Sequence, residues 1–363
     1  MRAPTWVGDA VMATPALRAL RAAHPAAHIA VEGRPAIGDL LRGLPAIDAF
    51  LPLPGRGARG IAARAAALSR ERFDWAVLLP DSARAALGPF LARVPRRAGY
   101  ARDPLRRALL NDALEPPRQA GRRLPIPMVE RYLRITRHLG CEDRGGSVEL
   151  AVDPRVAARI SELLARRGVE AKQALLVVTP GAGFGPSKLW PPAHFAKACA
   201  LLHARFGLRP VLAPAPDELG LARRIAEAAR GAGAFVFAVD DLPGLEALKA
   251  LVQRSSLVLS NDTGPRHIAV ALGRPVIVLM GPTDPRHTAC NLERQRVLRE
   301  DVACSPCQRK RCPIDHRCLV RLAPERVVDA AAELLATGSE PGYSTQLSTS
   351  RASTASERPI ARA

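Results

Sequence analysis

A polar turn between a short strand and a helix has the clearest chemical potential in this sequence. Residues 256–259, with the apolar run Leu257-Val258-Leu259, predict a buried strand, while residues 268–272 are apolar at helical spacing and end at Gly273. The turn between them reads Ser260-Asn261-Asp262-Thr263-Gly264-Pro265-Arg266-His267. Backbone N–H groups at such a helix start are unpaired and lie at the positive end of the helix dipole, so the turn can bind an anion such as phosphate. An ordinary capped helix of an α/β domain has the same pattern.

A second turn with the same potential follows the apolar strand predicted at residues 175–179. It runs from Pro180 to Pro191 and is rich in glycine, so its backbone can wrap a phosphate, and Lys188 supplies a point charge. Ligands of doubly wound sheets bind at the carboxyl ends of the strands. We therefore expect Lys188, Thr263 and Thr283 to lie at one edge of a sheet, because each comes just after a predicted strand.

The carboxylate of Asp9 is a third candidate, in a glycine-bearing turn that opens a helical stretch over residues 9–23. Pro15 lies inside this stretch and should kink or restart the helix. In an α/β fold such a turn follows the first buried strand, yet the sequence has no strand before it. We therefore expect that this strand, and with it an edge of the sheet, is missing, through a start assigned downstream of the real one or through truncation.

Strands and helices alternate along the chain, which predicts parallel, doubly wound sheets. The further strands are predicted at residues 28–32, 49–53, 75–79, 210–213, 235–239 and 276–279. The further helices are predicted at residues 37–42, 62–69, 128–140, 194–206, 218–229 and 244–254, with one more ending at Leu91. The length of 363 residues suits two domains, which we place at residues 1–153 and 154–336. Residues 337–363 are rich in Ser and Thr and predict a disordered tail.

The composition is strongly basic, with a formal net charge of +19, and 48% of the residues are hydrophobic. This charge fits an acidic substrate or a membrane surface, although the preference for Arg over Lys also indicates a compositional bias. The sequence has neither an apolar run long enough to span a membrane nor a signal peptide. Residues 93–123 form an arginine-rich segment that we interpret as a loop. As a cluster beside a pocket its arginines would suit a polyanionic acceptor, and singly they suit solvated surface.

Cysteines are concentrated in one segment, at Cys304, Cys307, Cys312 and Cys318. The seven cysteines do not resemble the disulfide framework of a secreted protein, so we expect a reducing cytoplasm. In that compartment the spacing of these four cysteines predicts a structural metal, with zinc first and iron second. Two local disulfides or free thiols are the alternatives.

Taken together, these motifs resemble the ADP-heptose:lipopolysaccharide heptosyltransferases, above all the type that adds the second inner-core heptose. The resemblance runs from Thr5 to about Leu335. It rests on Thr5-Trp6-Val7-Gly8-Asp9, Leu110-Asn111-Asp112, Met128-Val129-Glu130-Arg131-Tyr132, Pro180-Gly181-Ala182 with Lys188 and Trp190-Pro191, and Ser260-Asn261-Asp262-Thr263-Gly264 with His267. It implies a GT-B fold, in which two Rossmann-like domains face each other across a cleft, and inversion at the donor anomeric carbon.

The resemblance also implies roles for individual residues. Asp9 matches the family's proposed general base, which takes the proton of the attacking sugar hydroxyl. Glu246 matches a position implied to hold the donor ribose. The remaining donor-binding residues that we predict are Thr179, Gly181, Lys188, Asp262, Thr263, Gly264 and His267. The positive groups among them stabilise the leaving ADP, so no metal or other cofactor is required for the chemistry. We assign Arg97 and Arg102 to the acceptor.

The implied partners are ADP-heptose and a lipid A-Kdo-heptose acceptor, met at the cytoplasmic face of the inner membrane. A related transferase using another nucleotide sugar or a protein acceptor would carry the same donor motifs. A metal-containing nucleic-acid-binding module is the non-enzymatic alternative. Aromatic residues make up only 4% of the chain and the cysteines lie at one point of an α/β pattern, so we expect no nucleic acid.

Overall fold

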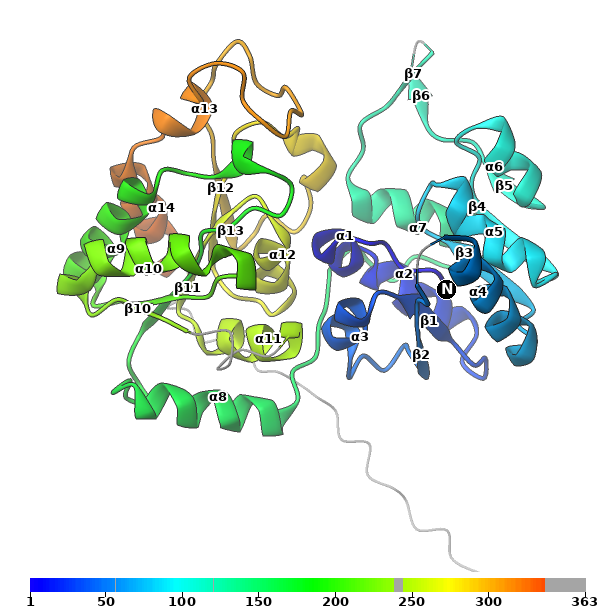
Figure 1. The fold of residues 1–363 in the computed structure, drawn as a ribbon, viewed down its shortest axis with the longest axis horizontal. Helices are drawn as coiled ribbons and strands as arrows, with labels where there is room; N and C mark the ends of the chain where they lie inside the picture. Colours follow the sequence, from blue (N-terminus) through cyan, green and yellow to red (C-terminus); the bar gives the residue numbers. More distant parts are fainter. Residues whose placement is uncertain (56, 120, 238–243, 337–363) are drawn as a thin grey trace, which may run out of the picture.

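The structure is a computed structural model that describes residues 1–55, 57–119, 121–237 and 244–336. The tail that we expect at residues 337–363 lies outside the described residues. Figure 1 shows two halves side by side, each with helices around a sheet. The first half is coloured blue to cyan and the second green to orange, and α1 (Val7–Met12) and α12 (Gly264–Ala271) meet between them.

The first half contains two groups of parallel strands. They are β1 (Ala30–Gly33) with β2 (Ala49–Pro52), and β3 (Trp75–Leu78) with β4 (Arg96–Tyr100) and β5 (Asp112–Leu114). The helices of this half are α1, α2 (Thr14–Ala23), α3 (Pro35–Leu41), α4 (Gly57–Glu71), α5 (Ala83–Leu91), α6 (Pro104–Leu109) and α7 (Met128–His138). A short antiparallel ribbon, β6 (Arg118–Gln119) and β7 (Arg122–Arg123), extends from it. Pro15 lies at the start of α2, and the helix restarts there as predicted.

The first residues of the chain occupy the position in which we expect a missing strand. Arg2 forms parallel bridges to Glu32 of β1 and Leu78 of β3. Its N–H donates to Val77 O at 2.8 Å, and the N–H of Ala3 donates to Glu32 O at 2.9 Å. No strand precedes α1 in the described residues, and a single bridged residue joins the two strand groups. The affected place is the middle of the sheet, so our expectation of a missing edge is wrong. The joined order is β2-β1-Arg2-β3-β4-β5.

The second half forms one parallel sheet in the described residues, in the order β10-β9-β8-β11-β12-β13. Counted from β8, this is the 3-2-1-4-5-6 order of doubly wound nucleotide-binding sheets. The strands are β8 (Leu175–Thr179), β9 (Arg209–Leu212), β10 (Phe235–Val236), β11 (Leu257–Asn261), β12 (Val276–Leu279) and β13 (Gln295–Leu298). The helices are α8 (Pro154–Arg166), α9 (Pro192–Phe206), α10 (Leu219–Ala228), α11 (Gly244–Arg254), α12, α13 (Arg317–Val320) and α14 (Pro324–Ala336). Short 3₁₀ turns are η1 (Pro186–Lys188), η2 (Pro216–Glu218), η3 (Arg230–Ala232) and η4 (Pro285–Thr288).

The arginine-rich segment at residues 93–123 is not a loop, contrary to our prediction, because it contains β4, α6 and β5. The buried part of β4 is short, Ala98 to Tyr100, and is preceded by two arginines, so the sequence lacks the apolar run that marks the other strands. Arg106 of α6 is fully buried and donates to the carbonyls of Tyr100 at 2.8 Å and Ser82 at 2.6 Å. A cation thus occupies a core position, which hydropathy alone does not anticipate.

Apolar packing joins the two halves. One buried cluster includes Val11 of α1 and Leu40 of α3 together with Leu251 of α11 and Ile268 of α12. A second cluster fills the other face of the second sheet. The domain boundary near residue 153 stays a prediction; between α7 and α8 the described chain has no helix or strand. Among the helices described, none combines the length and the apolar character needed to cross a membrane.

Candidate active site

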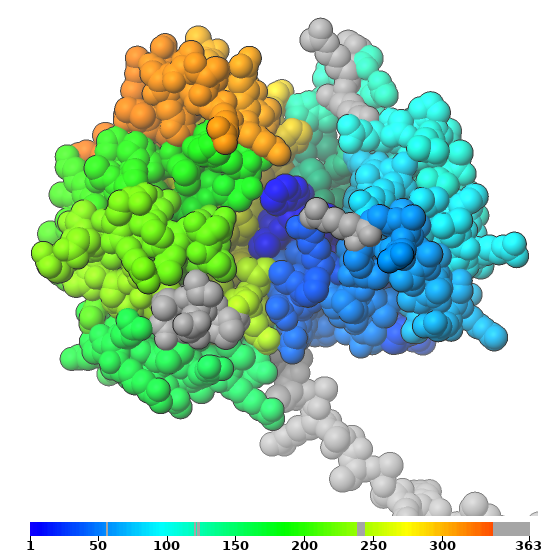
Figure 2. Space-filling model, in the orientation of Figure 1, coloured from blue at the N-terminus to red at the C-terminus, as the bar shows by residue number. Residues whose placement is uncertain are grey.

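Two helix starts, one from each half, are packed directly against each other at the centre of the molecule. A Cβ built on Gly8 of α1 would lie 2.6 Å from Cδ2 of His267, and one built on Gly264 of α12 would lie 2.7 Å from Cβ of Val7. Both glycines are therefore required for this close approach. Figure 2 shows the first residues, in dark blue, exposed in a recess between the two halves.

Asp9 lies in the first turn of α1, at this junction. Burial raises the pKa of its carboxyl to about 6, although the positive charges of Lys188 and His287 oppose the shift. A carboxylate with this pKa is ionised near neutral pH and can also accept a proton, as a general base must. Sequence reasoning missed His287, because an exposed histidine of a short 3₁₀ turn has no motif around it.

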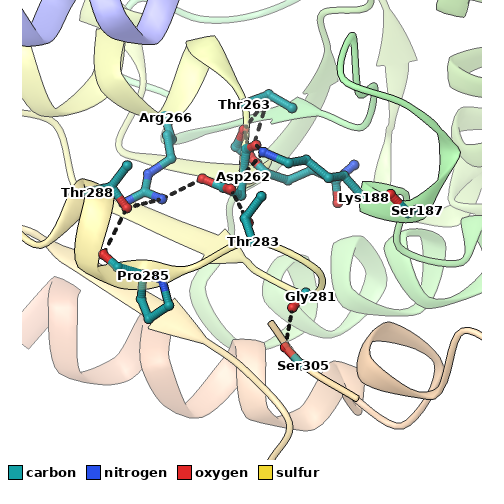
Figure 3. Close-up of polar contacts among 12 residues, drawn as sticks. Ser187, Lys188, Asp262, Thr263, Arg266, Gly281, Thr283, Pro285, Thr288 and Ser305 are labelled. Atoms are coloured by element: carbon teal, nitrogen blue, oxygen red, sulfur yellow. Dashed lines mark hydrogen bonds and ion pairs between the residues drawn. The ribbon is translucent and has the colours of Figure 1, made fainter. Parts of the chain in front are cut away.

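The Asp262 carboxylate is the centre of the hydrogen-bond network in the second half (Figure 3). Lys188 Nζ donates to Asp262 Oδ2 at 2.8 Å and to its backbone carbonyl at 2.7 Å. Thr283 Oγ1 also donates to Oδ2, at 2.6 Å, and Arg266 Nη1 donates to Oδ1 at 2.7 Å. Lys188 and Thr283, which we predicted to lie at one sheet edge together with Thr263, both bind the carboxylate of Asp262, the residue next to Thr263.

Charge and burial set the protonation states around Asp262. Burial alone would raise the pKa of this carboxyl, but the charges of Arg266 and Lys188 and the hydrogen bonds of Lys188 and Thr283 hold it well below its usual range. Burial, assisted by the charges of Arg266 and Lys188, lowers the pKa of His267 to about 3, although Asp262 acts in the opposite direction. The His267 imidazole is therefore neutral at pH 7 and brings no positive charge to the site.

Asn261 holds the glycine-rich turn against β11. Its Nδ2 donates to Pro180 O at 2.6 Å and Gly181 O at 3.2 Å, while its Oδ1 accepts from the Trp190 N–H at 3.3 Å. The turn thus begins at the end of β8, beside β11, where the strand order reverses and nucleotides bind in such sheets. Thr179, at the end of β8, is buried, and its hydroxyl lacks a partner among the described residues.

A glutamate that we did not predict lies at this turn. The Glu218 carboxylate fills the space beside Gly181, where a Cβ would lie 1.7 Å from its Cδ, and it accepts from the Ala215 N–H at 3.0 Å. Burial raises the pKa of this carboxyl. The predicted Glu246 has another neighbour: its carboxylate contacts Arg42, the residue after α3, at 3.3 Å, across the junction of the halves. The signal in the sequence that could have identified Glu218 is its position after the predicted strand at residues 210–213, which corresponds to β9, the neighbour of β8.

The four-cysteine segment is hydrogen-bonded to the turns after β8 and β12. The Ser187 N–H donates to Lys310 O at 3.1 Å, and Ser305 Oγ donates to Gly281 O at 2.6 Å. Cys304 and Cys307 are exposed, whereas Cys318 is buried against Gly281. Within the described chain, no three Cys, His, Asp or Glu side chains are grouped so that they could hold a metal ion. The structure therefore does not support the metal predicted at Cys304, Cys307, Cys312 and Cys318.

The arginines that we assigned to the acceptor lie towards opposite ends of β4. Arg97 lies near the amino end of β4, and its guanidinium donates to Leu109 O at 3.0 Å and Val94 O at 2.6 Å. Arg102 follows β4 on the surface, and its N–H donates to Tyr100 O at 3.1 Å. Arg97 thus ties the end of α6 to the start of β4, at the edge of the sheet away from the carboxyl ends.

Other arginines line a pocket at the carboxyl ends of β1, β2 and β3. Its volume is about 320 Å³, and its cationic lining residues within the described ranges are Arg2, Arg34, Arg64 and Arg84. Arg64 is buried and donates to Glu32 Oε2 at 2.6 Å. Burial lowers the pKa of Arg2 to about 10; the carboxylate of Glu32 opposes this shift, while the charges of Arg64 and Arg34 act in the same direction as burial. Like charges crowded in this way favour an anionic ligand.

Comparison with known proteins gives a consistent result. Residues 61–317 match the model of glycosyltransferase family 9 (heptosyltransferase). Lipopolysaccharide heptosyltransferase 2 of Salmonella typhimurium is 30% identical over 282 residues, which cover 75% of this chain and 79% of that protein. The family match begins after Asp9, so the role of this residue depends on the geometry.

Solved structures match over nearly the whole chain. The E. coli ADP-heptose lipopolysaccharide heptosyltransferase II superposes with a TM-score of 0.76 and 26% identity, covering 93% of this chain and 98% of that one. E. coli heptosyltransferase WaaC with ADP-2-deoxy-2-fluoro heptose has a TM-score of 0.66 and 23% identity, covering 92% and 99%. At that identity the second likeness establishes the fold, which is the predicted GT-B arrangement.

Proposed function

The chain belongs to glycosyltransferase family 9, the heptosyltransferases, and on that premise we propose that it transfers the second heptose of the lipopolysaccharide inner core. The donor is ADP-L-glycero-D-manno-heptose and the acceptor is a lipid A-Kdo-heptose. The observation that supports this most is the junction of α1 and α12, where a carboxylate of raised pKa adjoins an anion-binding helix start. These are the two groups that a sugar transfer needs.

The transfer is a single displacement. The acceptor hydroxyl attacks the anomeric carbon of the heptose, and the bond from that carbon to the phosphate oxygen breaks as the new glycosidic bond forms. The bonding electrons leave with ADP, and Asp9 takes the proton of the hydroxyl. Attack from the side opposite the leaving group inverts the anomeric configuration.

The leaving diphosphate gains negative charge as its bond breaks. Lys188 and the free backbone N–H groups at the start of α12 stabilise this charge, as preorganised donors do in a buried site. Thr179, Gly181, Thr263 and Gly264 belong to the same two turns and would contact the donor. The neutral His267 would contribute a hydrogen bond rather than charge.

Glu218, rather than Glu246, would hold the donor ribose. In doubly wound sheets the first strand leads into the turn that binds the phosphates. An acidic residue just after the neighbouring strand accepts hydrogen bonds from the ribose hydroxyls. Glu218 follows β9, the neighbour of β8, and its carboxylate adjoins Gly181. Glu246 already has an ion-pair partner, Arg42.

The arginine-lined pocket of the first half would bind the anionic groups of the acceptor. It lies at the carboxyl ends of the strands, on the same side of the sheet as the turn that carries Asp9. Arg34 and Arg84 have exposed side chains there, whereas Arg64 is committed to Glu32. A carboxylate or phosphate on the acceptor would pair with such guanidiniums.

The protein would meet this acceptor at the cytoplasmic face of the inner membrane. The net charge of +19 supports peripheral binding to anionic lipid. Co-sedimentation with phosphatidylglycerol vesicles, lost at high salt, is the expected result. Equal binding to phosphatidylcholine vesicles would contradict it.

The test is release of ADP from ADP-heptose by the purified protein with an inner-core acceptor carrying one heptose. Acceptor-dependent ADP release and a product one heptose heavier are expected, with unchanged rates after chelation of divalent metals. A product made only from another nucleotide sugar, or only on a protein, would support the related transferase instead. The absence of any turnover by folded protein with these substrates would refute the proposal.

A further inference from the structure

Asp262 is shared by two cations that approach its two carboxylate oxygens. Lys188 Nζ lies 2.8 Å from Oδ2, and Arg266 Nη1 lies 2.7 Å from Oδ1. Their side chains lie on opposite sides of Asp262 in Figure 3. All three are removed from solvent, with side-chain exposures of 12% for Lys188, 1% for Arg266 and 8% for Asp262.

The charges of this group do not cancel. Two buried cations face the one carboxylate of Asp262, so these three side chains carry one positive charge in excess. The Asp9 carboxylate, which interacts electrostatically with Lys188, offsets part of this charge when it is ionised, whether or not Arg266 is present. If Lys188 were paired with Asp262 alone, the pair would be neutral and would attract a diphosphate only weakly. Buried charges are screened little by solvent, so this difference has a large effect on an anion close by.

Arg266 is held in place by groups outside the donor turns. Its Nη2 donates to Gln295 Oε1 at 2.9 Å, and its Nη1 also lies 3.5 Å from Thr288 Oγ1. Gln295 is itself fixed by donating to the carbonyls of Cys290 and Asn291 at 3.0 and 2.7 Å. The guanidinium of Arg266 is therefore held on the side of Asp262 opposite to Lys188, whereas the side chain of Lys188 ends among the donor turns.

We propose that Arg266 is a positioning residue, which neutralises the Asp262 carboxylate and so leaves the charge of Lys188 to the diphosphate of the donor. The inference rests on the proposed binding of a nucleoside diphosphate sugar at these turns. A purely structural role for Arg266 predicts a different result, because an ion pair that only stabilises the fold would affect the affinities for ADP and adenosine equally. Only a ligand with phosphates responds to the excess charge.

The experiment measures the dissociation constants of ADP and adenosine by titration calorimetry with the full chain. Arg266→Met should weaken ADP binding by about tenfold, because one positive charge is lost near the diphosphate. Adenosine binding should change by less than about twofold, because the nucleoside carries no charge. Arg106→Met, at a fully buried arginine of the first half, is the matched control and should leave both constants unchanged.

A second substitution provides a rescue. Asp262→Asn added to Arg266→Met removes the carboxylate that Arg266 neutralises, so ADP affinity should return to within about threefold of wild type. Replacing both members of a buried ion pair is also better tolerated than removing one. Arg266→Lys keeps the charge and should retain the ADP preference, which provides a test if Arg266→Met does not fold.

Three outcomes would overturn the role of Arg266: an equal loss of ADP and adenosine binding, no recovery in the double variant, or ADP affinity unchanged in Arg266→Met. A wild-type protein that fails to bind ADP would instead refute the proposed donor site. The two failures are therefore distinguishable.

Discussion

The two halves repeat one strand order but build its central strand differently. In the second half β8 pairs along its length with β9 and β11. In the first half Arg2 alone bridges β1 and β3. Each element leads into a turn at the point where the strand order reverses, one towards Asp9 and the other towards Lys188. The position of such a turn therefore depends more on the two neighbouring strands than on the length of the strand that leads into the turn.

The halves also differ in how their cations are paired. Lys188 and Arg266 share Asp262, so each member of that group depends on the others. In the first half Arg64 pairs with Glu32, while Arg34 and Arg84 line an open pocket. Substitutions should therefore have coupled effects in the second half and smaller, nearly additive effects in the first.

The largest effect should follow the loss of the base at the junction of the halves. Asp9→Asn keeps the shape of the side chain but removes its ability to accept a proton, so kcat should fall by about 10²–10⁴. The measurement is steady-state ADP release with both substrates saturating. Unchanged ADP affinity would attribute the loss to chemistry, and a kcat within about twofold of wild type would remove Asp9 from the mechanism.

The pH profile tests the same residue without a substitution. Burial raises the pKa of Asp9 to about 6, and a base acts only when deprotonated. The value of kcat/KM should therefore rise with pH up to about 6 and level off above it. A profile already flat between pH 5 and 7 would contradict this assignment.

Lys188→Met should have the next largest effect on activity. It tests the second half, in which Lys188, Asp262 and Arg266 depend on one another. Loss of the cation nearest the leaving group should lower kcat/KM for the donor by about 10²-fold. The control is Lys197→Met, on the exposed side of α9, which should leave the kinetics unchanged. An equal effect of the two substitutions would show that only overall charge matters.

Gly8→Ala tests the contact between the halves. The new Cβ would lie 2.6 Å from His267, so the helices must separate, and the free energy of unfolding should fall by about 1–3 kcal/mol. Chemical denaturation measures it. Gly231→Ala, where a Cβ has open space around it, is the control and should change the stability little. Equal stability of the two variants would mean that α1 and α12 are less tightly apposed.

The smallest effects should come from the open arginine pocket. Arg34→Ala and Arg84→Ala should each raise the acceptor KM by about three- to tenfold, because one charged hydrogen bond is lost. The donor KM should stay constant. Arg93→Ala, on the surface after α5, is the control. If Arg93→Ala changes the acceptor KM as much as the other two, acceptor binding depends on diffuse charge and not on this pocket.

The turns that we assign to the donor could be located from sequence because their signals are local. The turns after β8, β11 and β12 each follow an unbroken apolar run, and Lys188 and Asp262 stand out within them. The acceptor side gave no such signal. Arg97 and Arg84 look alike in an arginine-rich sequence, and only the packing shows that Arg97 binds backbone carbonyls while Arg84 borders a pocket.

Two further sites show the same limit of sequence reasoning. The resemblance pointed to Glu246 for the donor ribose and gave no signal for Glu218, because the contact of Glu218 with Gly181 joins residues far apart in the chain. The cysteine spacing predicted a metal, whereas the fold buries Cys318 and exposes Cys304 and Cys307. Spacing along the chain fixes neither the burial nor the direction of a side chain.

The sequence by itself determined the alternation of strands and helices, the doubly wound class and the two polar turns after β8 and β11, because apolar periodicity and glycine-rich turns act over short distances. Only the tertiary structure decided that Arg2 completes the first sheet, that Gly8 packs on His267 and that Arg266 shares Asp262 with Lys188. These contacts join residues far apart in the chain, and their effects on charge depend on burial, which arises only when the two halves pack together.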